Sequence, residues 1–325
     1  MAPRFRAEAF EDVFDEWEAL LPSCSTNTVF VTPAWQRLWW EHFGDGWSLS
    51  LLSFRENGRL AGLAPLASKD GVLSFLGGRD LFDYHDFLAP KGHEVQFFEA
   101  LFDHLSSLEW GTVELHTIPE GSPTLEMVRT HADRLGFSVT VNEEEKAPVM
   151  ALPTTWDEYL SGLSKKRRHE LRRKIRRLEA AGEYAQTNYT TADEVRDALP
   201  DFFRLHAASS PDKAEYMTAE RKSFFVDMAT ELADRGTLVL SLLELRGARV
   251  AACINFDYLD GYLLYNSGYD PDYSDLSVGL INTALTIKDA IKAGKASFDF
   301  LRGTERYKYH LGAEDRSVYL ATIRR

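Results

Sequence analysis

"LSLLSFRENGRLAGLAPLA" (residues 49–67) and "LSLLELRGARVAACINFDY" (residues 240–258) read alike, although they lie in different halves of the chain. Each is an apolar run, a short polar turn and a second apolar run, which is typical of a β-hairpin. We expect the turns at Glu56-Asn57-Gly58 and Arg246-Gly247-Ala248. The two hairpins therefore indicate an internal duplication.

The likeness continues along both copies. Each hairpin is followed by a third apolar run, a loop rich in Asp and Tyr, a helical pattern and a further strand. In the first copy these are, in order, "VLSFLGG", "RDLFDYHDFLAP", "EVQFFEALFDHLSSLEWG" and "TVELHTI". In the second copy they are "GYLLYNSG", "YDPDYSDLSV", "GLINTALTIKDAIKAG" and "ASFDFLRG". Gly111 and Gly294 suit left-handed residues at the helix ends. Three antiparallel strands followed by a helical crossover predict an α/β fold with a mixed sheet of the α+β type in each of two tandem domains.

The boundary is expected in "NEEEKAPVMALPTTW" (residues 142–156), which combines an acidic run with two prolines. Beyond it, Thr155 and Glu158 have the spacing of a capping box at a helix start. The sequence therefore predicts one domain over 1–152 and a second over 153–325.

A basic stretch, "SKKRRHELRRKIRRLEAAG" (residues 164–182), follows this boundary. Its nine Lys or Arg and two Glu give it a net charge of +7 in a chain of −13, so the remainder carries −20. Ser164 suits a helix start, Gly182 a stop, and the apolar stripe between them consists of Leu171, Ile175 and Leu178. An acidic body does not condense on phosphate backbones, so any anion contact must be local. The stretch alone does not decide between a nucleic-acid-binding helix, a solvated strut and part of a site for another anion.

Other motifs are few. Cys24 and Cys253 are far apart and form no CxxC, so we expect buried core thiols. The N-terminus lacks the apolar segment of a signal peptide, and no apolar run approaches the ~20 residues of a membrane span, so the expected location is cytoplasmic. No HExxH, P-loop or GxGxxG occurs, and no metal site is predicted.

Three segments together resemble FemAB-like and CelD-like acyltransferases, a branch of the GNAT superfamily with two GNAT-like domains in each chain. They are "YNSGYDPDYSDLSVGLINTALTIKDAIKAGKASFDFLRGTERYKYHLGA" (265–313), "LSKKRRHELRRKIRRLEAAG" (163–182) and "DYHDFLAP" (83–90). The likeness is strongest from Ser161 to Ala313. It implies an N-acyltransferase that moves an acyl group from acyl-CoA, or in some relatives from aminoacyl-tRNA, to an amine.

The resemblance also implies a donor site at "SDLSVGL" (274–280), where a strand opens into a helix. Free N–H groups at such a helix start bind anions, and a glycine lets the backbone approach a phosphate. The implied cofactor-binding residues are Tyr273, Leu276, Ser277, Val278, Gly279 and Leu280, with Lys165 and Arg168 for the adenine-side phosphate. The superfamily's Gln/Arg-x-x-Gly-x-Gly/Ala pattern is not met, because only Gly279 is a glycine here.

Acyl transfer needs an amine that loses a proton, a stabilised oxyanion and a proton for the leaving thiolate. The resemblance suggests oxyanion donors on "LLYNSGY" (263–269), with Tyr265 and Asn266 beside the substrate. Tyr269 and Tyr273 are candidate proton donors for the thiolate. Candidate groups in "FDFLRGTERYKYH" (298–310) are Asp299, Arg302, Glu305 and Lys308. Asp299 reads equally well as a base or as the ion-pair partner of Arg302, and Lys308 matches the family's Gly-x-x-x-Tyr-Lys segment.

The first copy lacks the "SVG" feature, and the resemblance implies that it shapes the acceptor cleft. Asp83, Tyr84 and His85 are the expected substrate contacts there, with Asp86 orienting the acceptor amine. The acceptor class is a small-molecule, peptide or amino-sugar amine, with cell-envelope or polysaccharide biosynthesis as one setting. The alternatives are an aminoacyl-tRNA-dependent transferase of the Fem ligase type and a non-catalytic binding protein.

Overall fold

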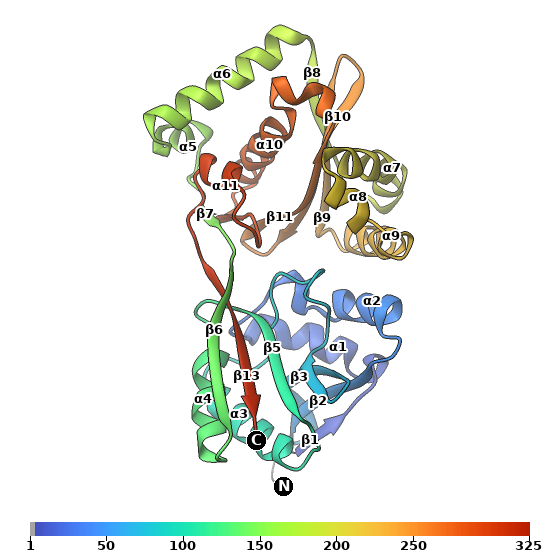
Figure 1. Ribbon diagram of the computed structural model, residues 1–325, viewed down its shortest axis with the longest axis vertical. Coiled ribbons are helices and arrows are strands. Elements are labelled where there is room, and N and C mark those ends of the chain that lie inside the picture. Colours follow the sequence, from blue (N-terminus) through green and yellow to red (C-terminus); the bar gives the residue numbers. More distant parts are fainter. Residues whose placement is uncertain (1–3) are drawn as a thin grey trace. The chain divides into compact units, whose positions relative to one another are not determined.

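The computed structural model describes residues 4–325 and divides the chain into two compact units. Unit 1 ends at Lys146 but also takes in Arg316–Arg325, and unit 2 is Ala147–Asp315 (Figure 1). The sequence boundary at 152/153 placed the C-terminus in the second domain. In the structure the last strand, β13 (Ser317–Arg324), instead pairs with two strands of the first sheet.

Unit 1 is built on a seven-stranded mixed sheet in the order β1-β2-β3-β4-β5-β13-β6. Its pairs are antiparallel except for β4 and β5, which are parallel. Its other strands are β1 (Arg4–Ala7), β2 (Ser48–Glu56), β3 (Arg59–Lys69), β4 (Val72–Phe75), β5 (Thr112–Pro119) and β6 (Ser138–Lys146). Its α-helices are α1 (Phe10–Leu20), α2 (Pro33–Phe43), α3 (Glu94–Ser106) and α4 (Thr124–Arg134).

Unit 2 contains a six-stranded sheet in the order β7-β12-β11-β10-β9-β8, in which β11 and β12 are the parallel pair. Its strands are β7 (Val149–Ala151), β8 (Tyr184–Tyr189), β9 (Leu238–Leu245), β10 (Ala248–Tyr258), β11 (Gly261–Tyr269) and β12 (Ser297–Asp299). Its α-helices are α5 (Trp156–Gly162), α6 (Lys165–Ala181), α7 (Ala192–Ser209), α8 (Pro211–Tyr216), α9 (Ala219–Asp234), α10 (Val278–Lys292) and α11 (Arg306–His310). In Figure 1, α10 covers one face of this sheet and α7 and α9 cover the other.

The repeat is present in both units as three antiparallel strands, a helix and a strand parallel to the third. It comprises β2, β3, β4, α3 and β5 in unit 1 and β9, β10, β11, α10 and β12 in unit 2. Both hairpins turn through two residues with positive φ, Asn57-Gly58 and Arg246-Gly247, as the right-handed twist of paired strands favours. The predicted mixed α/β fold in two tandem units is confirmed.

One of the two predicted helix caps is wrong. Gly294 has φ +73 directly after the C-cap of α10, as expected. However, α3 ends at Ser106, five residues before Gly111, and Gly111 does not have a positive φ. A Cβ at Gly111 would lie 3.3 Å from the Gly71 carbonyl oxygen, so this glycine permits a close approach between two loops.

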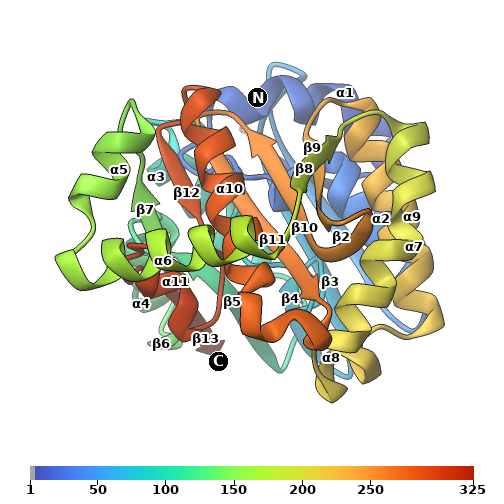
Figure 2. The same cartoon turned by 90° about the horizontal axis from the view of Figure 1, so that it is seen from above.

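Helix α6 has the boundaries that the sequence predicts. The Ser164 side chain accepts a hydrogen bond from the Arg167 backbone N–H, and the helix stops at Gly182. Leu171 and Leu178 are buried, while most of the basic residues are exposed. The helix crosses α10 and α11 with its apolar stripe inward (Figure 2).

In both units, helices pack on the sheet to form the hydrophobic core. In unit 1, α3 and α4 pack on the sheet around Phe97, Phe98 and Phe102. In unit 2, α10 packs through Ile281 and Ile287 on the opposite side of the sheet from α7 and α9.

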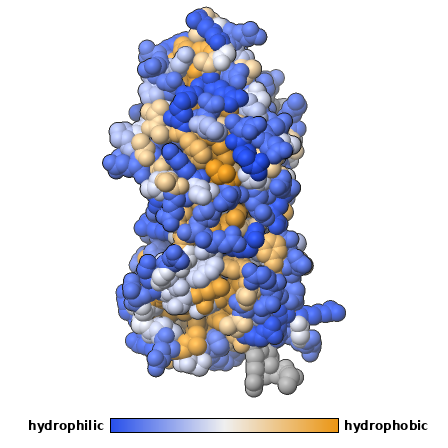
Figure 3. Space-filling model, turned by 90° about the vertical axis from the view of Figure 1, so that its right-hand side faces the viewer, coloured by the Kyte–Doolittle hydropathy of each residue, from blue (hydrophilic) through white to orange (hydrophobic). Residues whose placement is uncertain are grey.

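On the face drawn in Figure 3, hydrophilic residues predominate and hydrophobic residues appear as patches between them. Within residues 4–325, no helix is both long and apolar enough to cross a membrane.

Candidate functional site

The parallel strands of unit 2 separate at the middle of β11. Its pairing with β12 covers Gly261 to Leu263 and goes no further. Directly afterwards β11 carries a bulge, because Leu264 and Asn266 oppose consecutive residues of β10 and leave Tyr265 as the extra residue. A bulge re-aims the backbone and often lies beside a functional site. The splayed end that the resemblance implied for residues 263–269 is therefore present.

The start of α10 lies at this opening. Ser277 has φ +58 and no side-chain cap bond to the helix, so the first-turn N–H groups of Val278, Gly279 and Leu280 lack an intrahelical partner. A Cβ at Gly279 would lie 3.1 Å from the Tyr269 ring, so a larger residue would crowd the end of β11. The positive end of the helix dipole adds to this exposed set of donors.

Two cations of α6 reach the same turn. Lys174 Nζ lies 2.6 Å from Ser277 Oγ, and the Arg177 guanidinium donates to the carbonyl of Asp275. Lys174 also lies 3.6 Å from Glu170 on its own helix. The basic helix is thus fixed beside the start of α10, which gives this region a local positive potential in an acidic chain.

Two pockets of similar size flank this turn. One, of about 320 Å³, lies at the splayed end of β11; its lining residues are Lys213, Ser267, Gly268, Tyr269, Ser274, Ser277, Val278, Gly279, Leu280, Thr283 and Tyr307. We call it the strand pocket. The other, of about 330 Å³, lies between α6, α10 and α11; its lining residues are Ser164, Lys166, Arg167, Glu170, Leu171, Lys174, Leu280, His310 and Leu311. We call it the helix pocket.

The strand pocket contains two further polar side chains, Lys213 and Tyr307. Nothing in the sequence pointed to Lys213, and Tyr307 lay in the candidate segment as the tyrosine of the Gly-x-x-x-Tyr-Lys match. Lys213 Nζ donates to the Ser267 carbonyl over 2.6 Å, and burial lowers the pKa of this ammonium. Tyr307 hydrogen-bonds the Ser267 side chain, and burial raises the pKa of its phenol, so it is neutral and keeps its proton at physiological pH. The pocket therefore presents a cation and a hydroxyl beside the free section of β11.

Lys308 is buried and fully engaged with the loop that precedes it. Its ammonium donates to the carbonyls of Leu301, Arg302 and Gly303 over 3.1, 2.7 and 3.0 Å, which uses all three N–H groups. Glu305 forms an ion pair with it over 3.0 Å. This geometry makes Lys308 a positioning residue that holds a loop containing two positive-φ residues, Leu301 and Gly303.

The other candidates in this segment lie in the same loop. Asp299 ends β12 and accepts a hydrogen bond over 2.7 Å from the Leu301 N–H. Glu305 precedes α11 and its side chain is 59% exposed. The Arg302 carbonyl binds Lys308, as described above. Asp299, Arg302 and Glu305 are therefore brought together by one turn, with Glu305 the most accessible to solvent.

The substrate candidates on the bulge pack towards α7 and α9. The Tyr265 ring stacks on Phe225 of α9 at 5.8 Å. Asn266 Oδ1 lies 2.9 Å from Nε2 of His206, a buried residue of α7. Burial, aided by the nearby Lys213 charge, lowers the pKa of His206 to about 4, so the imidazole is neutral and Nε2 donates. Tyr265 and Asn266 thus anchor the bulge to the helices behind it.

The unit 1 candidates form a buried network. Asp86 is 2% exposed and accepts hydrogen bonds from the hydroxyls of Thr26, Ser122 and Thr124 and from the Phe87 N–H. Burial raises its pKa, and the four donors act in the opposite sense. These contacts tie the start of α4 to two loops, which is a structural role. Contact with an acceptor amine stays a prediction for this residue.

Its neighbours are also packed inside unit 1. Tyr84 is 7% exposed, with its ring edge-on to Phe30. His85 is 2% exposed, stacks between Phe75 and Phe82, and contacts the Thr117 hydroxyl at 2.7 Å. Asp83 is half-buried in the same loop.

A second polar cluster in unit 1 was not anticipated from the sequence. Glu144 pairs with His116 at 2.7 Å and with Arg79 at 3.0 Å, and it accepts from the Thr117 N–H at 2.8 Å. The hydrogen bond to Glu144 raises the pKa of His116. Thr117 has φ +53, an uncommon conformation for a β-branched residue, at the bulge of β5 against β13. A lone histidine in the strand "TVELHTI" gave no indication of this arrangement.

The two predicted phosphate contacts on α6 differ in position. Lys165 is exposed on the outer face of the helix. Arg168 donates to the carbonyls of Leu160, Ser161 and Leu163, so it caps the end of α5. The pocket-facing cations are instead Lys166, Arg167 and Lys174. The sequence does not show which of these cations face inward, because basic residues lie all around the helix. Only the packing of the apolar stripe determines which of them face inward.

Both cysteines are buried, as expected for core thiols. Burial raises the pKa of Cys253 to about 11, and its sulfur contacts the Asn282 side chain at 3.2 Å behind α10. Among the residues that the structure describes, no group of three His, Cys, Asp or Glu side chains is placed to hold a metal ion.

Comparison with known proteins shows that solved structures with a similar fold exist. No curated protein sequence matches the chain. Solved structures with a similar fold include FemX (11% identity, TM-score 0.66, 98% of this chain and 96% of FemX). A second is the C-terminal domain of a putative lysylphosphatidylglycerol synthetase from Agrobacterium fabrum (10%, 0.62, 97% and 92%). A third is a tandem GNAT protein from the clavulanic acid biosynthesis pathway (12%, 0.54, 98% and 98%).

At these identities the likeness shows the fold alone. It extends over both units, in agreement with the repeat. The model of the acetyltransferase (GNAT) domain family matches residues 165–309, which contain the splayed strands, the start of α10 and both pockets. The chain therefore has two tandem GNAT-like units, and the match to the acetyltransferase (GNAT) domain family lies in the second of them.

Proposed function

We propose that unit 2 binds acyl-CoA and transfers its acyl group to an amine, as an N-acyltransferase of the FemAB-like or CelD-like branch. The observation that carries this proposal is the strand pocket, which lies where β11 leaves β12 and the first turn of α10 begins. One pocket thus combines free strand backbone, a helix N-terminus and buried donors. A thioester with a phosphorylated tail requires that combination.

The donor phosphates meet the first turn of α10. The N–H groups of Val278, Gly279 and Leu280 and the Lys174 ammonium supply donors and positive charge there. Tyr273 and Leu276 pack against the same core cluster and hold the turn in place. Acyl-CoA is the co-substrate that these contacts suit.

The chemical step takes place along the free section of β11. Backbone N–H groups next to the bulge stabilise the negative charge that develops on the thioester carbonyl oxygen when the amine attacks the carbonyl carbon. Tyr307 is a neutral phenol within the pocket, and with Tyr269 it is our candidate to protonate the leaving thiolate. Glu305, the exposed carboxylate of the neighbouring loop, is the candidate to accept the amine proton, while Asp299 and Lys308 position that loop.

The acceptor is an amine, and we assign its recognition to unit 1. A partly exposed imidazole held by a carboxylate, His116 (28% exposed) with Glu144, offers a polar group there that the buried Asp86 does not. Small-molecule, peptide and amino-sugar amines are the acceptor classes to screen, with envelope and polysaccharide precursors first.

A calorimetric and thermal-shift comparison of coenzyme A, several acyl-CoAs and charged tRNA tests the donor. We expect acyl-CoA to bind and to raise the melting temperature, because a ligand that binds only the folded state stabilises it. Release of free thiol in the presence of an amine panel then tests the reaction. Tight binding of charged tRNA without any response to coenzyme A would overturn the acyl-CoA assignment.

One observation favours aminoacyl-tRNA as a second candidate donor. The outer face of α6 is exposed and strongly basic: Lys165, His169, Arg173 and Arg176 border a shallow hollow there, together with Lys166 and Glu170, which also line the helix pocket. RNA binding there would weaken steeply with salt, since each phosphate contact releases counterions. A binding protein without catalysis would bind donor or RNA and release no product.

A further inference from the structure

Lys213 of α8 places its ammonium at the strand pocket with most of its hydrogen-bonding capacity unused. Among residues 4–325, its side chain donates one hydrogen bond, to the Ser267 carbonyl over 2.6 Å. An ammonium has three N–H groups, so two remain for another acceptor. The residue is partly buried, and burial lowers its pKa, so water compensates this charge only in part.

The protein offers this ammonium no close carboxylate within the described part of the chain. Glu305 is the acid whose charge acts on Lys213, but its side chain is 59% exposed and forms its ion pair with Lys308 at 3.0 Å. None of the residues that the structure places around the strand pocket is acidic. A partly buried charge without a counter-ion is costly, so an anion that enters the pocket gains its attraction without displacing a partner.

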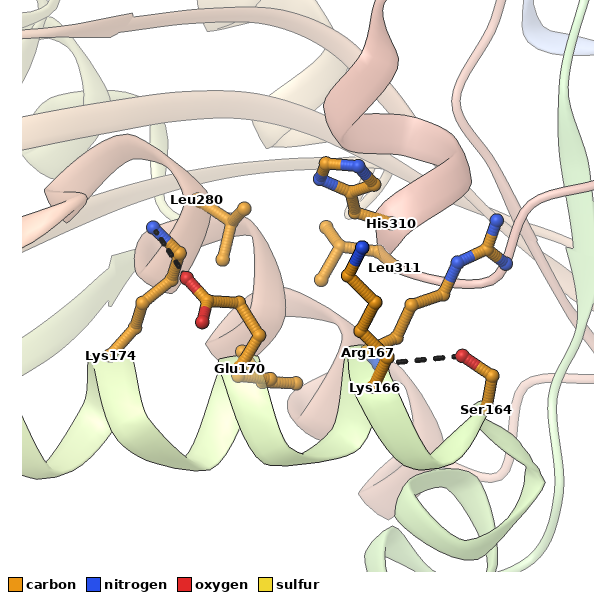
Figure 4. Close-up of a pocket in the computed structure, with 9 residues that line it drawn as sticks. Ser164, Lys166, Arg167, Glu170, Lys174, Leu280, His310 and Leu311 are labelled. Carbon is orange, nitrogen blue, oxygen red and sulfur yellow. Dashed lines mark hydrogen bonds and ion pairs between the residues drawn. The ribbon is translucent and has the colours of Figure 1, made fainter.

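Two other lysines near the site are bound by groups of the protein itself. Lys308 uses all three N–H groups on the carbonyls of its own loop. In the helix pocket, Figure 4 shows the Lys174 ammonium directed at the Glu170 carboxylate, and the same ammonium contacts Ser277 at 2.6 Å. Lys213 differs from both, because its remaining N–H groups face a cavity of about 320 Å³.

The position of Lys213 relates this charge to the reacting ends of the substrates. Its partner Ser267 follows Asn266 directly, so it lies on the free section of β11, just past the bulge at Tyr265. We place the chemical step along that section, whereas the donor phosphates are assigned to the first turn of α10. An anion held by Lys213 therefore belongs to the acyl group or to the acceptor and not to the phosphorylated tail of the donor.

The free capacity of Lys213 suits a carboxylate. Two N–H groups match its two oxygens, and one positive charge matches its one negative charge. A phosphate monoester carries close to two negative charges, and among the described lining residues of the pocket only Lys213 is basic. Carboxylates occur at the end of dicarboxylic acyl groups and in amino acids and peptides.

We propose that Lys213 binds a carboxylate of the substrate that reacts in the strand pocket, and so selects either a dicarboxylic acyl group or an amino acid or peptide as acceptor. This inference rests on the proposed function and adds a specificity to it. Lys213 orients the substrate and takes no part in the making or breaking of bonds. Binding of the carboxylate raises the pKa of Lys213, because a nearby negative charge favours the ammonium form.

Two comparisons on the full chain identify the source of the carboxylate. Calorimetry compares succinyl-CoA with butyryl-CoA, which has the same chain length and no terminal charge. Thiol release from acetyl-CoA compares a panel of amino acids and dipeptides with their amides as acceptors. We expect a preference of at least tenfold for the carboxylate form in one of the two comparisons, because one charge-assisted contact supplies about that much.

Variants of Lys213 test whether this residue causes the preference. Lys213→Met should abolish it and leave the affinity for the uncharged form within about twofold. Lys213→Arg, which keeps the charge, should retain most of it. Lys222→Met removes an exposed lysine of α9 that does not line the pocket, and should keep the full preference. Melting curves of all variants check that each is folded.

A measurement on the wild type needs no coenzyme A. In protein with ¹³C-labelled lysine, the Cε signal of Lys213 is assigned by its absence in Lys213→Arg and is followed by NMR as a function of pH. Succinate should raise the pKa of Lys213, and the uncharged succinamide should leave it unchanged.

The possible results separate the two claims. No carboxylate preference in either comparison, or a preference that persists in Lys213→Met, would overturn the carboxylate site and leave the acyl-CoA assignment standing. Equal losses in Lys222→Met and Lys213→Met would indicate a diffuse charge effect and would also reject the site. If no acyl-CoA binds, the proposed function fails and the NMR titration alone decides: a pKa raised by succinate supports the carboxylate site, and an unchanged pKa rejects it.

Discussion

The ammonium of Lys174 on α6 lies 2.6 Å from the hydroxyl of Ser277, the residue that precedes α10. A charge from the basic helix is thereby held at a helix N-terminus, where the dipole alone would already attract an anion. The hydroxyl has no bond to its own helix, so it is used for this contact. The two residues are 103 positions apart in the sequence, and their contact fixes α6 against the start of α10.

We predict that Lys174→Met weakens acyl-CoA binding by about tenfold, which corresponds to roughly 1.4 kcal/mol and to the loss of one charge-assisted contact. Ser277→Gly should have a smaller effect on affinity and none on folding, because glycine readily adopts the positive φ of this position. Titration calorimetry measures both, with Arg172→Met as the matched control. Unchanged affinity in Lys174→Met would remove this lysine from the donor site.

The bulge of β11 depends on close packing against α7. A Cβ at Gly268 would lie 2.4 Å from both the N and Cα of His206, so only glycine fits there. We predict that Gly268→Ala destabilises unit 2 by about 3 kcal/mol or more, since backbone atoms cannot move aside as a flexible side chain does. Gly261→Ala on the same strand is the control, because its nearest atom would be 3.5 Å away. Urea unfolding of both variants measures the difference; equal stability would contradict the packing.

The repeat made the fold predictable from sequence. Hairpin turns such as Asn57-Gly58 and Arg246-Gly247 are local signals, and matching order in two copies predicts the long-range topology. The position of β13 was not predictable in the same way. A strand that returns to the other unit's sheet has the same alternating pattern as one that stays in its own. Only pairing with β5 and β6 distinguishes the two.

The site was predictable as a region and not residue by residue. The family resemblance pointed to the start of α10 through Ser277 and Gly279, and their part in donor binding stays a prediction. It did not indicate Lys213, and it included Tyr307 in a candidate segment without a separate role, since the position of both beside Ser267 depends on tertiary packing. Lys308 shows the opposite case: its position matched a family motif, but its contacts are with its own loop.

We predict that Lys308→Met lowers stability as well as turnover. Removal of the ammonium leaves the carbonyls of Leu301, Arg302 and Gly303 without their donors, which costs roughly 2–3 kcal/mol. Lys288→Met, an exposed lysine on α10, is the control and should match the wild type. Unfolding curves and turnover are measured on the same samples. A Lys308→Met protein of wild-type stability that has lost turnover would show a direct role in catalysis instead.

The buried His206 makes unit 2 sensitive to acid. Its pKa in the folded protein is about 4, below the ordinary value near 6.5, because burial and the Lys213 charge disfavour the imidazolium. The unfolded chain therefore binds the extra proton first, so this group's contribution is present above pH 6.5 and is lost as pH falls towards 4. The loss amounts to at most about 3 kcal/mol by the shift in pKa.

We predict that His206→Gln flattens this pH dependence, because the amide can donate to Asn266 Oδ1 without titrating. The free energy of unfolding is measured in urea at pH 7.5 and 4.5 for the wild type and the variant. Burial also lowers the pKa of His131 in unit 1, so some acid sensitivity remains and the difference between the two proteins isolates His206. His169→Gln, on the exposed face of α6, should retain the full wild-type dependence. Parallel curves for the wild type and His206→Gln would show that this imidazole is not held neutral by the fold.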